Sequence, residues 1–383
     1  MMVRLFLTSI LILCCVHGTY AATSEEVVIK NAGFTRTLSY GAGILKTSKI
    51  EANGVQILDQ PSVELMIDIE DKGENVTLIP SEFDIKSVIK GGDERETTIT
   101  AKLQCRRVDY PLAIEITYTA GLKAEYQQKS ISVMPCKKLR NATLRRISID
   151  DFNFKGDYLP VTPLNKVELL DTKADDVASP SDFVFDKRSD FGAYDPKASK
   201  GFYFYSDAAK PACIFTPGHY LSISEQMNVA LDKGYDTSKT IIGAVAGSPD
   251  VLFARYRVLT LNAQFASLGR AKQFAAFKKR FDSYFSICHY SAKGQSLNNV
   301  SQEVHIINDQ GLLVLINSSN EPQKIMLPLA AAGLKSTDAL RLSDWSSLDS
   351  PVDLGLVQLT DKIEVELPPS VPRIIGINLA PAQ

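Results

Sequence analysis

TITAKLQC, the stretch Thr98–Cys105, alternates apolar and polar residues with a period of two. This period puts the apolar side chains on one face of a β-strand and the polar side chains on the other. LAIEITY at Leu112–Tyr118 and RISID at Arg146–Asp150 share the alternation, and turn-forming pairs such as Asn53-Gly54 separate such runs. Because no helix-length amphipathic segment interrupts these strands, the sequence predicts antiparallel sheets in a large β-sandwich.

The apolar spacing changes to three and four residues between about Pro249 and Phe285, which predicts helix. Pro249 suits the first turn of a helix, and Gly269 predicts a break between two helices. The apolar positions of this segment are Leu252, Tyr256, Leu259, Phe274, Phe277, Phe281, Tyr284 and Phe285.

Strand patterns return from His289 to the end of the chain. Asn308-Asp309-Gln310 lies between the runs Glu303–Ile307 and Gly311–Asn317 and predicts a hairpin. Further expected strands are Gln323–Leu329, Leu356–Leu359, Ile363–Leu367 and Arg373–Leu379. These runs predict a second, smaller β-sandwich of about 95 residues that closes the chain.

The first 22 residues have the order of a secretory signal peptide. Arg4 precedes the apolar run Leu5–Val16, and small residues follow in Gly18–Ala22. We therefore expect export to the periplasm or the cell exterior. No later apolar run has the length that spans a bilayer, and a net charge of −2 supplies no basic field for nucleic acid.

Four cysteines follow the expected signal peptide: Cys105, Cys136, Cys213 and Cys288. Their spacing lacks the CxxC pattern of a zinc site, and we expect neither a metal nor a cofactor. Four cysteines allow three disulfide pairings, and four buried thiols are the alternative. Cys105 and Cys136 are the first pair to test because both lie in strand-like stretches.

Several stretches are similar to one family of enzymes. NAGFTRTLSYGAGILKTSKI (Asn31–Ile50) and QPSVELMIDI (Gln60–Ile69) resemble the opening of the N-terminal β-supersandwich of α-galactosidase-type glycoside hydrolases. FAAFKKRF (Phe274–Phe281) resembles their last barrel helix. GLLVLIN (Gly311–Asn317) and IMLPL (Ile325–Leu329) resemble their C-terminal sandwich.

The resemblance implies a mainly β fold that lacks the family's catalytic domain. Those enzymes carry both catalytic carboxylates on a (β/α)₈ barrel, which needs roughly 200 residues or more. The interval from Val245 to His289 is about 44 residues, so we expect no (β/α)₈ barrel and carry over no catalytic residue. The expected division is a signal peptide at 1–22, a β-supersandwich at 23–248, a helical connector at 249–287 and a C-terminal β-sandwich at 288–383.

Two acidic motifs are candidates for catalytic or ligand-binding groups. Lys173-Ala174-Asp175 has the spelling of the family's nucleophile motif, but no apolar strand leads into it, which favours a solvated loop. Asp150-Asp151 favours a turn at a strand end, with a calcium or sugar-hydroxyl contact as the functional alternative.

The polar loop Phe185–Asp195 and the aromatic strand that follows it supply the candidate carbohydrate-binding residues. The loop has the residue types that line sugar sites, and the alternative is an ordinary surface loop. The strand Gly201–Tyr205 carries aromatics on both faces, so one face is core and the other is a stacking platform or an inter-domain contact. The candidates are Arg188, Asp190, Phe191, Tyr194, Tyr203 and Tyr205.

Three functional hypotheses follow. The first is an exported, carbohydrate-associated protein that binds glycan or a partner protein through sandwich surfaces without its own hydrolytic site. The second is an active glycoside hydrolase with an unrecognised site or a barrel supplied by another chain. The third is a structural remnant or truncated gene product that binds nothing.

The apolar stripe of residues 274–285 must leave water in each case. We expect it to pack on the strands Gly311–Ile316 and Ile325–Leu329. The alternative is a partner protein or a homodimer that covers it.

Overall fold

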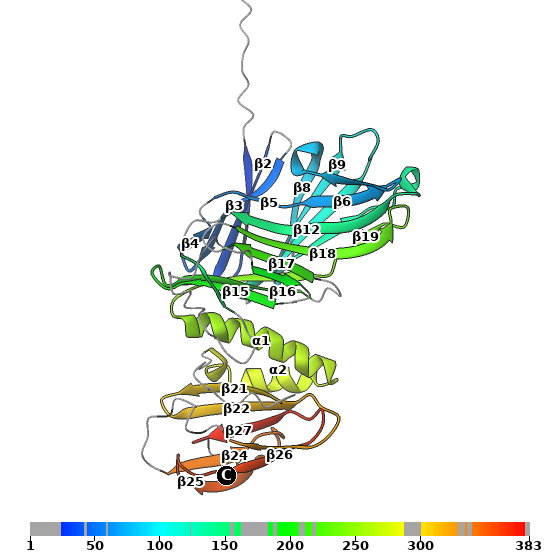
Figure 1. Cartoon of the computed structure of the whole chain (residues 1–383). Coiled ribbons are helices and arrows are strands. Elements are labelled where there is room, and N and C mark those ends of the chain that lie inside the picture. The colour runs from blue at the N-terminus through cyan, green and yellow to red at the C-terminus, as the bar shows by residue number, and fades with distance from the viewer. Residues whose placement is uncertain are drawn as a thin grey trace, which may run out of the picture.

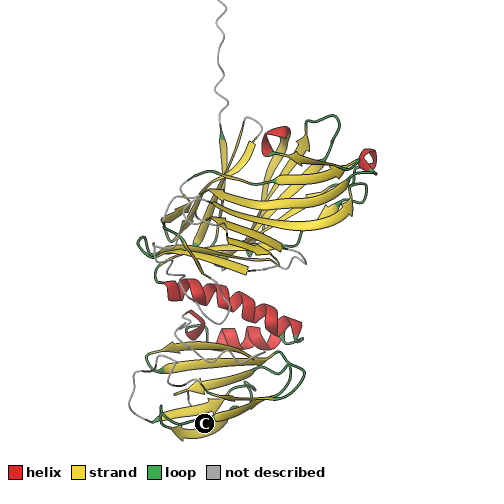
Figure 2. Ribbon diagram, in the orientation of Figure 1, coloured by secondary structure: helices red, strands yellow, loops and turns green. Residues whose placement is uncertain are grey.

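A computed structural model describes most of the chain. The described residues are 24–41, 44–58, 60–122, 124–153, 157–161, 183–186, 190–206, 211–216, 220–286, 300–327, 329, 334 and 339–379. The expected signal peptide lies outside them. Within them the fold is mainly β, with antiparallel strand pairings and two α-helices between the two β regions (Figures 1 and 2).

Two large sheets form the N-terminal region (Figure 1). Sheet A contains β1 (Glu25–Lys30), β2 (Phe34–Gly41), β3 (Ile44–Ala52), β4 (Val55–Leu58), β5 (Ser62–Val63), β6 (Met66–Asp71), β7 (Glu74–Leu78), β12 (Thr143–Asn153), β14 (Phe183–Asp186), β17 (Pro211–Thr216) and β18 (Tyr220–Ala230). Sheet B contains β8 (Phe83–Gly92), β9 (Glu96–Cys105), β10 (Ala113–Gly121), β11 (Tyr126–Val133), β13 (Leu159–Val161), β15 (Asp190–Asp195), β16 (Lys200–Ser206), β19 (Tyr235–Asp236) and β20 (Thr240–Ala246).

Alternation along the strands builds the core between sheets A and B. In β10, every second side chain is buried, including Ile114, Ile116 and Tyr118. These side chains pack against apolar residues of sheet A such as Ile67 and Ile147 in one continuous cluster. Because the strand period is two, this register puts one face of β10 out of water.

Local turn chemistry sets the hairpins that the sequence predicts. Asn53 and Gly54 both have positive φ, 49° and 79°, and connect β3 to β4. Asn308 and Asp309 have φ of 50° and 60° and connect β21 to β22. Two consecutive residues at positive φ form the turn that matches the twist of a two-residue hairpin.

Two helices lie between the β regions. α1 spans Pro249–Ser267 and α2 spans Ala271–Arg280, with the 3₁₀ turn η3 at Tyr284–Ser286. Two further 3₁₀ turns lie in the N-terminal region, η1 (Pro80–Glu82) and η2 (Lys137–Leu139). α1 begins at Pro249, and Gly269 separates the helices at a φ of 71°, so both predicted boundary signals are confirmed.

The C-terminal region is a smaller sandwich of two sheets. Sheet C contains β21 (Val300–Ile307), β22 (Gln310–Asn317), β24 (Leu340–Asp344), β25 (Val352–Val357) and β27 (Arg373–Ile377), and sheet D contains β23 (Gln323–Met326) and β26 (Glu364–Leu367). One face of sheet C packs on sheet D through residues such as Leu313, Ile375 and Val365. The other face meets the helices (Figure 1).

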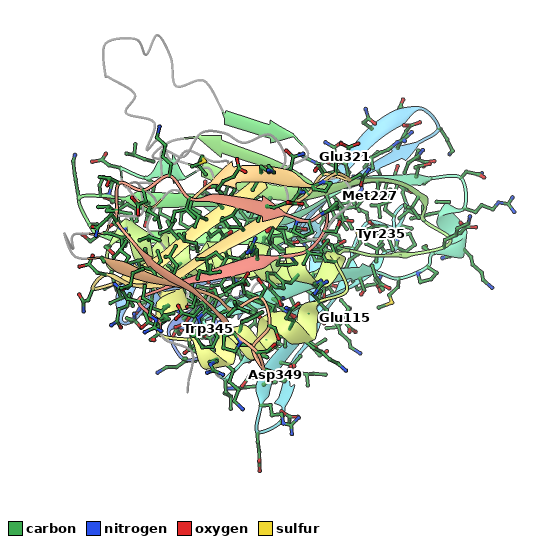
Figure 3. All side chains as sticks on the ribbon, turned by 90° about the horizontal axis from the view of Figure 1, so that it is seen from below. Glu115, Met227, Tyr235, Glu321, Trp345 and Asp349 are labelled. Atoms are coloured by element: carbon green, nitrogen blue, oxygen red, sulfur yellow. The ribbon has the colours of Figure 1, made fainter. Side chains whose placement is uncertain are left out.

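The aromatic stripe of the connector is buried within the chain. Phe274, Phe277, Phe281 and Phe285 are at most 6% exposed, and they pack with sheet C residues and Trp345. Figure 3 views the molecule from this C-terminal end and labels Trp345. The ring centroids of Trp345 and Phe281 lie 5.2 Å apart, and the two rings meet edge to face. Trp345 is thus a core anchor. Burial of one such side chain contributes roughly 1.5–3 kcal/mol.

The predicted packing partners of this stripe are half right. Leu312, Val314 and Ile316 of β22 contact the stripe, as expected. Ile325 and its neighbours do not, because their apolar side chains belong to the core between sheets C and D. The expected second contact, with the strand Ile325–Leu329, is therefore wrong.

The described residues contain no closed barrel. β20 ends at Ala246 and β21 begins at Val300, and the described elements between them are α1, α2 and η3. The mainly β fold with a short helical connector, predicted from the sequence, is confirmed for the described residues.

Candidate functional site

The predicted carbohydrate-binding residues lie on and before strands β15 and β16. Arg188 lies outside the described residues. Asp190 and Phe191 begin β15, where their backbones pair with Tyr205 and Phe204 of β16.

Three tyrosines of this set lie under helix α1. Tyr194 and Tyr203 are 2% and 1% exposed and pack with Leu252 and Leu259 of α1, while Tyr205 is half-buried against the same cluster. These three tyrosines therefore pack against α1. Tyr194 and Tyr203 do not form an exposed stacking platform, since α1 covers that face of the strands.

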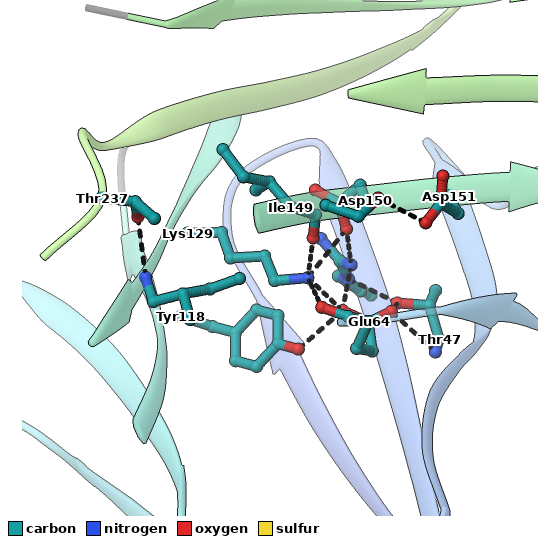
Figure 4. Close-up of polar contacts among 11 residues, drawn as sticks. Thr47, Glu64, Tyr118, Lys129, Ile149, Asp150, Asp151 and Thr237 are labelled. Carbon is teal, nitrogen blue, oxygen red and sulfur yellow. Dashed lines mark hydrogen bonds and ion pairs between the residues drawn. The ribbon is translucent and has the colours of Figure 1, made fainter. Parts of the chain in front are cut away.

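Asp150 lies inside β12 within a buried cluster of charges (Figure 4). The Arg36 Nη2 atom donates to Asp150 Oδ1 over 2.6 Å and to Glu64 Oε2 over 2.7 Å. The Lys129 Nζ atom donates to the same two carboxylate oxygens over 3.1 and 2.7 Å. The four side chains are at most 1% exposed.

Two further residues donate hydrogen bonds to the Glu64 carboxylate. The backbone N–H of Thr47 donates to Oε1 over 2.9 Å, and the Tyr118 hydroxyl donates to Oε2 over 2.6 Å. Burial alone would raise the pKa of Glu64, but Coulombic attraction from Arg36 and Lys129 outweighs it and holds the pKa well below 4.5. For Asp150, burial dominates over the same two cations and raises the pKa.

This charge cluster ties sheet A to sheet B rather than binding a ligand. Arg36 and Asp150 come from sheet A, and Lys129 and Tyr118 come from sheet B. The predicted turn at Asp150, with its calcium or sugar alternative, is wrong because the residue is a buried strand position. The alternation along β11 is the sequence signal that could have indicated the burial of Lys129. Lys129 lies on the same strand face as Ile131 and Val133, and that face is buried.

A groove of about 470 Å³ lies between sheet B and the helices, and we call it the seam groove. Such a volume is within the range of small-molecule sites. Its lining includes Glu125 and Tyr126 at the start of β11, Tyr203 of β16, Ala254, Arg255 and Val258 of α1, Phe274, Ala275 and Lys278 of α2, and Asp282 and Phe285 after α2.

Helical spacing directs the α1 and α2 residues into the groove. Ala254 and Val258 lie four residues apart on α1, and Ala275 and Lys278 lie three apart on α2, so each pair shares one helix face. The alanines leave the space that larger side chains would fill. Phe274 and Phe285 contribute apolar side chains to the lining of the groove.

Two tyrosines, Tyr126 and Tyr203, are among the residues that line the groove. Tyr126 is half-buried, and its carbonyl accepts a hydrogen bond of 2.7 Å from the Asn31 amide, which anchors the start of β11. Tyr203 lies across Gly243 so closely that a Cβ at that position would be 2.1 Å from the ring. Burial, with a contribution from Tyr126, raises the pKa of Tyr203 and keeps its hydroxyl protonated.

The four charged side chains of the groove form two ion pairs. Arg255 pairs with Glu125, and the two side chains are 32% and 35% exposed. Lys278 Nζ lies 3.2 Å from Asp282 Oδ1. Burial lowers the pKa of Arg255, and the nearby Asp282 counters this shift. The groove is therefore lined by hydrogen-bond donors, hydrogen-bond acceptors and tyrosines.

Other candidate chemistry is limited in the described part of the chain. Cys105 and Cys136 are both free, so the first pairing to test is not formed in this structure. The described residues contain no cluster of His, Cys, Asp and Glu able to hold a metal ion. Among the described helices, none has the length and hydropathy needed to cross a membrane.

Solved structures similar to this chain include α-galactosidases of glycoside hydrolase family 36. The α-galactosidase from Lactobacillus brevis aligns with a TM-score of 0.45 and 8% identity, over 63% of this chain and 42% of that one. The α-galactosidase AgaB from Geobacillus stearothermophilus, a family 36 enzyme, aligns with a TM-score of 0.42 and 10% identity, over 62% of this chain and 42% of that one.

A glycoside hydrolase family 97 enzyme from Pseudoalteromonas sp. strain K8 is also similar, with a TM-score of 0.38 and 9% identity over 58% of this chain and 36% of that one. The α-galactosidase resemblance seen in the sequence is thus found again among solved structures. The chain spans less than half the length of these enzymes. It matches no protein-family model and no curated sequence.

Proposed function

We propose that this chain is an exported carbohydrate-binding protein that holds a saccharide in the seam groove without hydrolysing it. The observation that carries the proposal is that tyrosine side chains and charged hydrogen-bonding groups line the same groove. Export rests on the signal-like residues 1–22, and the proposed domains keep the boundaries 23–248, 249–287 and 288–383.

The groove has the two chemical features that a sugar ring requires. A pyranose has an apolar C–H face that packs on an aromatic ring, and Tyr126 is a half-buried residue that lines the groove. The hydroxyl groups of a sugar both donate and accept hydrogen bonds. Glu125 and Asp282 supply acceptors and Arg255 supplies donors along the rim.

The same groove is unsuited to hydrolysis of a glycosidic bond. That reaction needs a protonated carboxylic acid and a second carboxylate on opposite sides of the bond. Glu125 and Asp282 are each paired with a cation, Arg255 and Lys278 respectively, so neither carboxylate is free of a partner. Glu64 and Asp150, which both pair with Arg36, are at most 1% exposed and out of reach of a substrate.

Binding and hydrolysis are tested together on the purified protein. A glycan array should show saccharide binding that Tyr126→Ala weakens, and aryl α-galactosides should not be hydrolysed above background. Tyr40→Ala is the matched control, because Tyr40 is also half-buried but lines a different cleft beside β8. Turnover abolished by a single Asp→Asn or Glu→Gln change would instead support the active-hydrolase hypothesis.

A partner protein or second copy on the helix 274–285 is not favoured as a second function. The aromatic stripe that such a partner would cover is already buried on sheet C. Of the seven exposed residues of α2, four are charged (Lys272, Lys278, Lys279 and Arg280) and three are alanines.

A further inference from the structure

The charges of the seam groove also define the class of its ligand. We infer that the groove takes a short, electrically neutral saccharide that bridges sheet B and the two helices. This inference rests on the proposed function and narrows it to one chemical class.

Charge balance within the groove is the first step. Among the described residues, two carboxylates and two cations line it, and each carboxylate has a cation as its partner. The described lining therefore carries no net charge. Sites that select an anion or a cation leave a charge of opposite sign available to it, whereas both signs are neutralised here.

A charged sugar would be repelled by the lining groups that have its own sign of charge. A uronate carboxylate that approached Arg255 would come close to two other carboxylates. Glu125 already pairs with Arg255, and Asp282 interacts electrostatically with the same guanidinium. Like charges brought together repel each other, which weakens binding. An ammonium group would meet Lys278 and Arg255 in the same way. Neutral hydroxyl groups can bond to both members of each pair without separating them.

The space available for the ligand lies between the helices and the sheet. Ala275 is an exposed residue of α2 that lines the groove, whereas its neighbour Ala276 is exposed but does not line it. A large side chain at 275 would occupy the groove without displacing any core residue. The same side chain at 276 would extend into solvent, so the two positions form a matched pair.

Titration calorimetry with four trisaccharides tests the inference. Maltotriose, cellotriose and galactotriose are the neutral probes, and trigalacturonate is the acidic probe. We expect at least one neutral probe to bind wild-type protein, about tenfold or more tighter than trigalacturonate. Ala275→Trp should weaken that binding at least about tenfold, and Ala276→Trp should leave it unchanged.

Each other outcome has a distinct meaning. If only trigalacturonate binds, loses affinity with added salt and is sensitive to Ala275→Trp, the neutral class is wrong and carbohydrate binding in the groove stands. If a probe binds equally well to wild type and to Ala275→Trp, the site is elsewhere and the inference fails. If none of the four probes binds, both this inference and the proposed function are rejected for these sugar classes.

Discussion

Arg36 on β2 holds Asp150 on β12 through a hydrogen bond of 2.6 Å, although 114 positions separate the two residues in the chain. Both side chains are at most 1% exposed, and Lys129 reaches the same Asp150 oxygen from sheet B. A buried charge is tolerated only when it is paired. The cluster therefore makes the stability of the sandwich depend on one particular alignment of sheets A and B.

Removal of Arg36 should strongly destabilise the protein. In Arg36→Met, Glu64 and Asp150 keep only Lys129 as a cation, and loss of one partner from a buried pair costs about 3–5 kcal/mol. Chemical denaturation measures this loss. Arg146→Met is the control: its ion pair with Asp68 is 33% and 26% exposed, so we expect a change of at most about 1 kcal/mol. Equal effects of the two substitutions would contradict the role of the cluster.

Glu64 should make the folded protein sensitive to acid. Its folded-state pKa lies well below 4.5, so the unfolded chain binds a proton that the folded chain does not as the pH falls through that value. Stability from Glu64 is present above about pH 4.5 and is lost progressively below it. Asp150, with a raised pKa, works in the opposite direction.

The contribution of Glu64 is isolated by comparison with Glu64→Gln. The unfolding free energy of the wild type, measured from pH 6 to pH 3, should fall more steeply than that of the variant. Parallel curves for the two proteins would show that Glu64 does not titrate in this way.

Gly243 should be intolerant of a side chain because of Tyr203. A Cβ at 243 would lie 2.1 Å from the Tyr203 ring, so Gly243→Ala should cost about 1–3 kcal/mol by overpacking. The Tyr203→Ala background removes the clash. A double-mutant cycle measured by thermal or chemical unfolding should therefore show strong coupling between the two sites, whereas additive effects would place the ring elsewhere.

Phe277 and Phe281 should stabilise the C-terminal sandwich rather than an oligomer. Replacement of either by Ala should cost about 3–5 kcal/mol, because both rings are buried on sheet C. Fluorescence of Trp345, the single tryptophan, reports the loss since its ring contacts Phe281. The oligomeric mass should not change, and Lys279→Ala, an exposed position on the same helix, should have little effect. A changed mass with an unchanged unfolding transition would support a partner interface instead.

Features set by neighbouring residues could be predicted from the sequence. The start of α1 at Pro249, the helix break at Gly269 and the hairpin at Asn308-Asp309 each follow from the backbone preferences of a few adjacent residues. The strand alternation around Thr98–Cys105 likewise predicts β9. Sequence patterns of this kind sufficed for the mainly β fold.

The charge cluster and the groove could not be predicted because distant segments meet in them. Lys129 and Glu64 are 65 positions apart, and the pairing of Arg255 with Glu125 requires α1 to lie on sheet B. Tyr203 shows the same limit. Its strand was predicted with aromatics on both faces, but only the position of α1 decides that its ring is covered. The periodicity of a single sequence indicates which residues share one face of a strand or helix. It does not indicate which other element packs against that face.

A crystal structure of the protein with a saccharide bound tests the central claim most directly. The crystals should be grown with a neutral trisaccharide that binds in calorimetry. We predict a sugar ring packed on Tyr126 in the seam groove, with hydroxyl groups within hydrogen-bond distance of Arg255 and Asp282. A saccharide bound on another surface while the seam groove holds none would contradict the account.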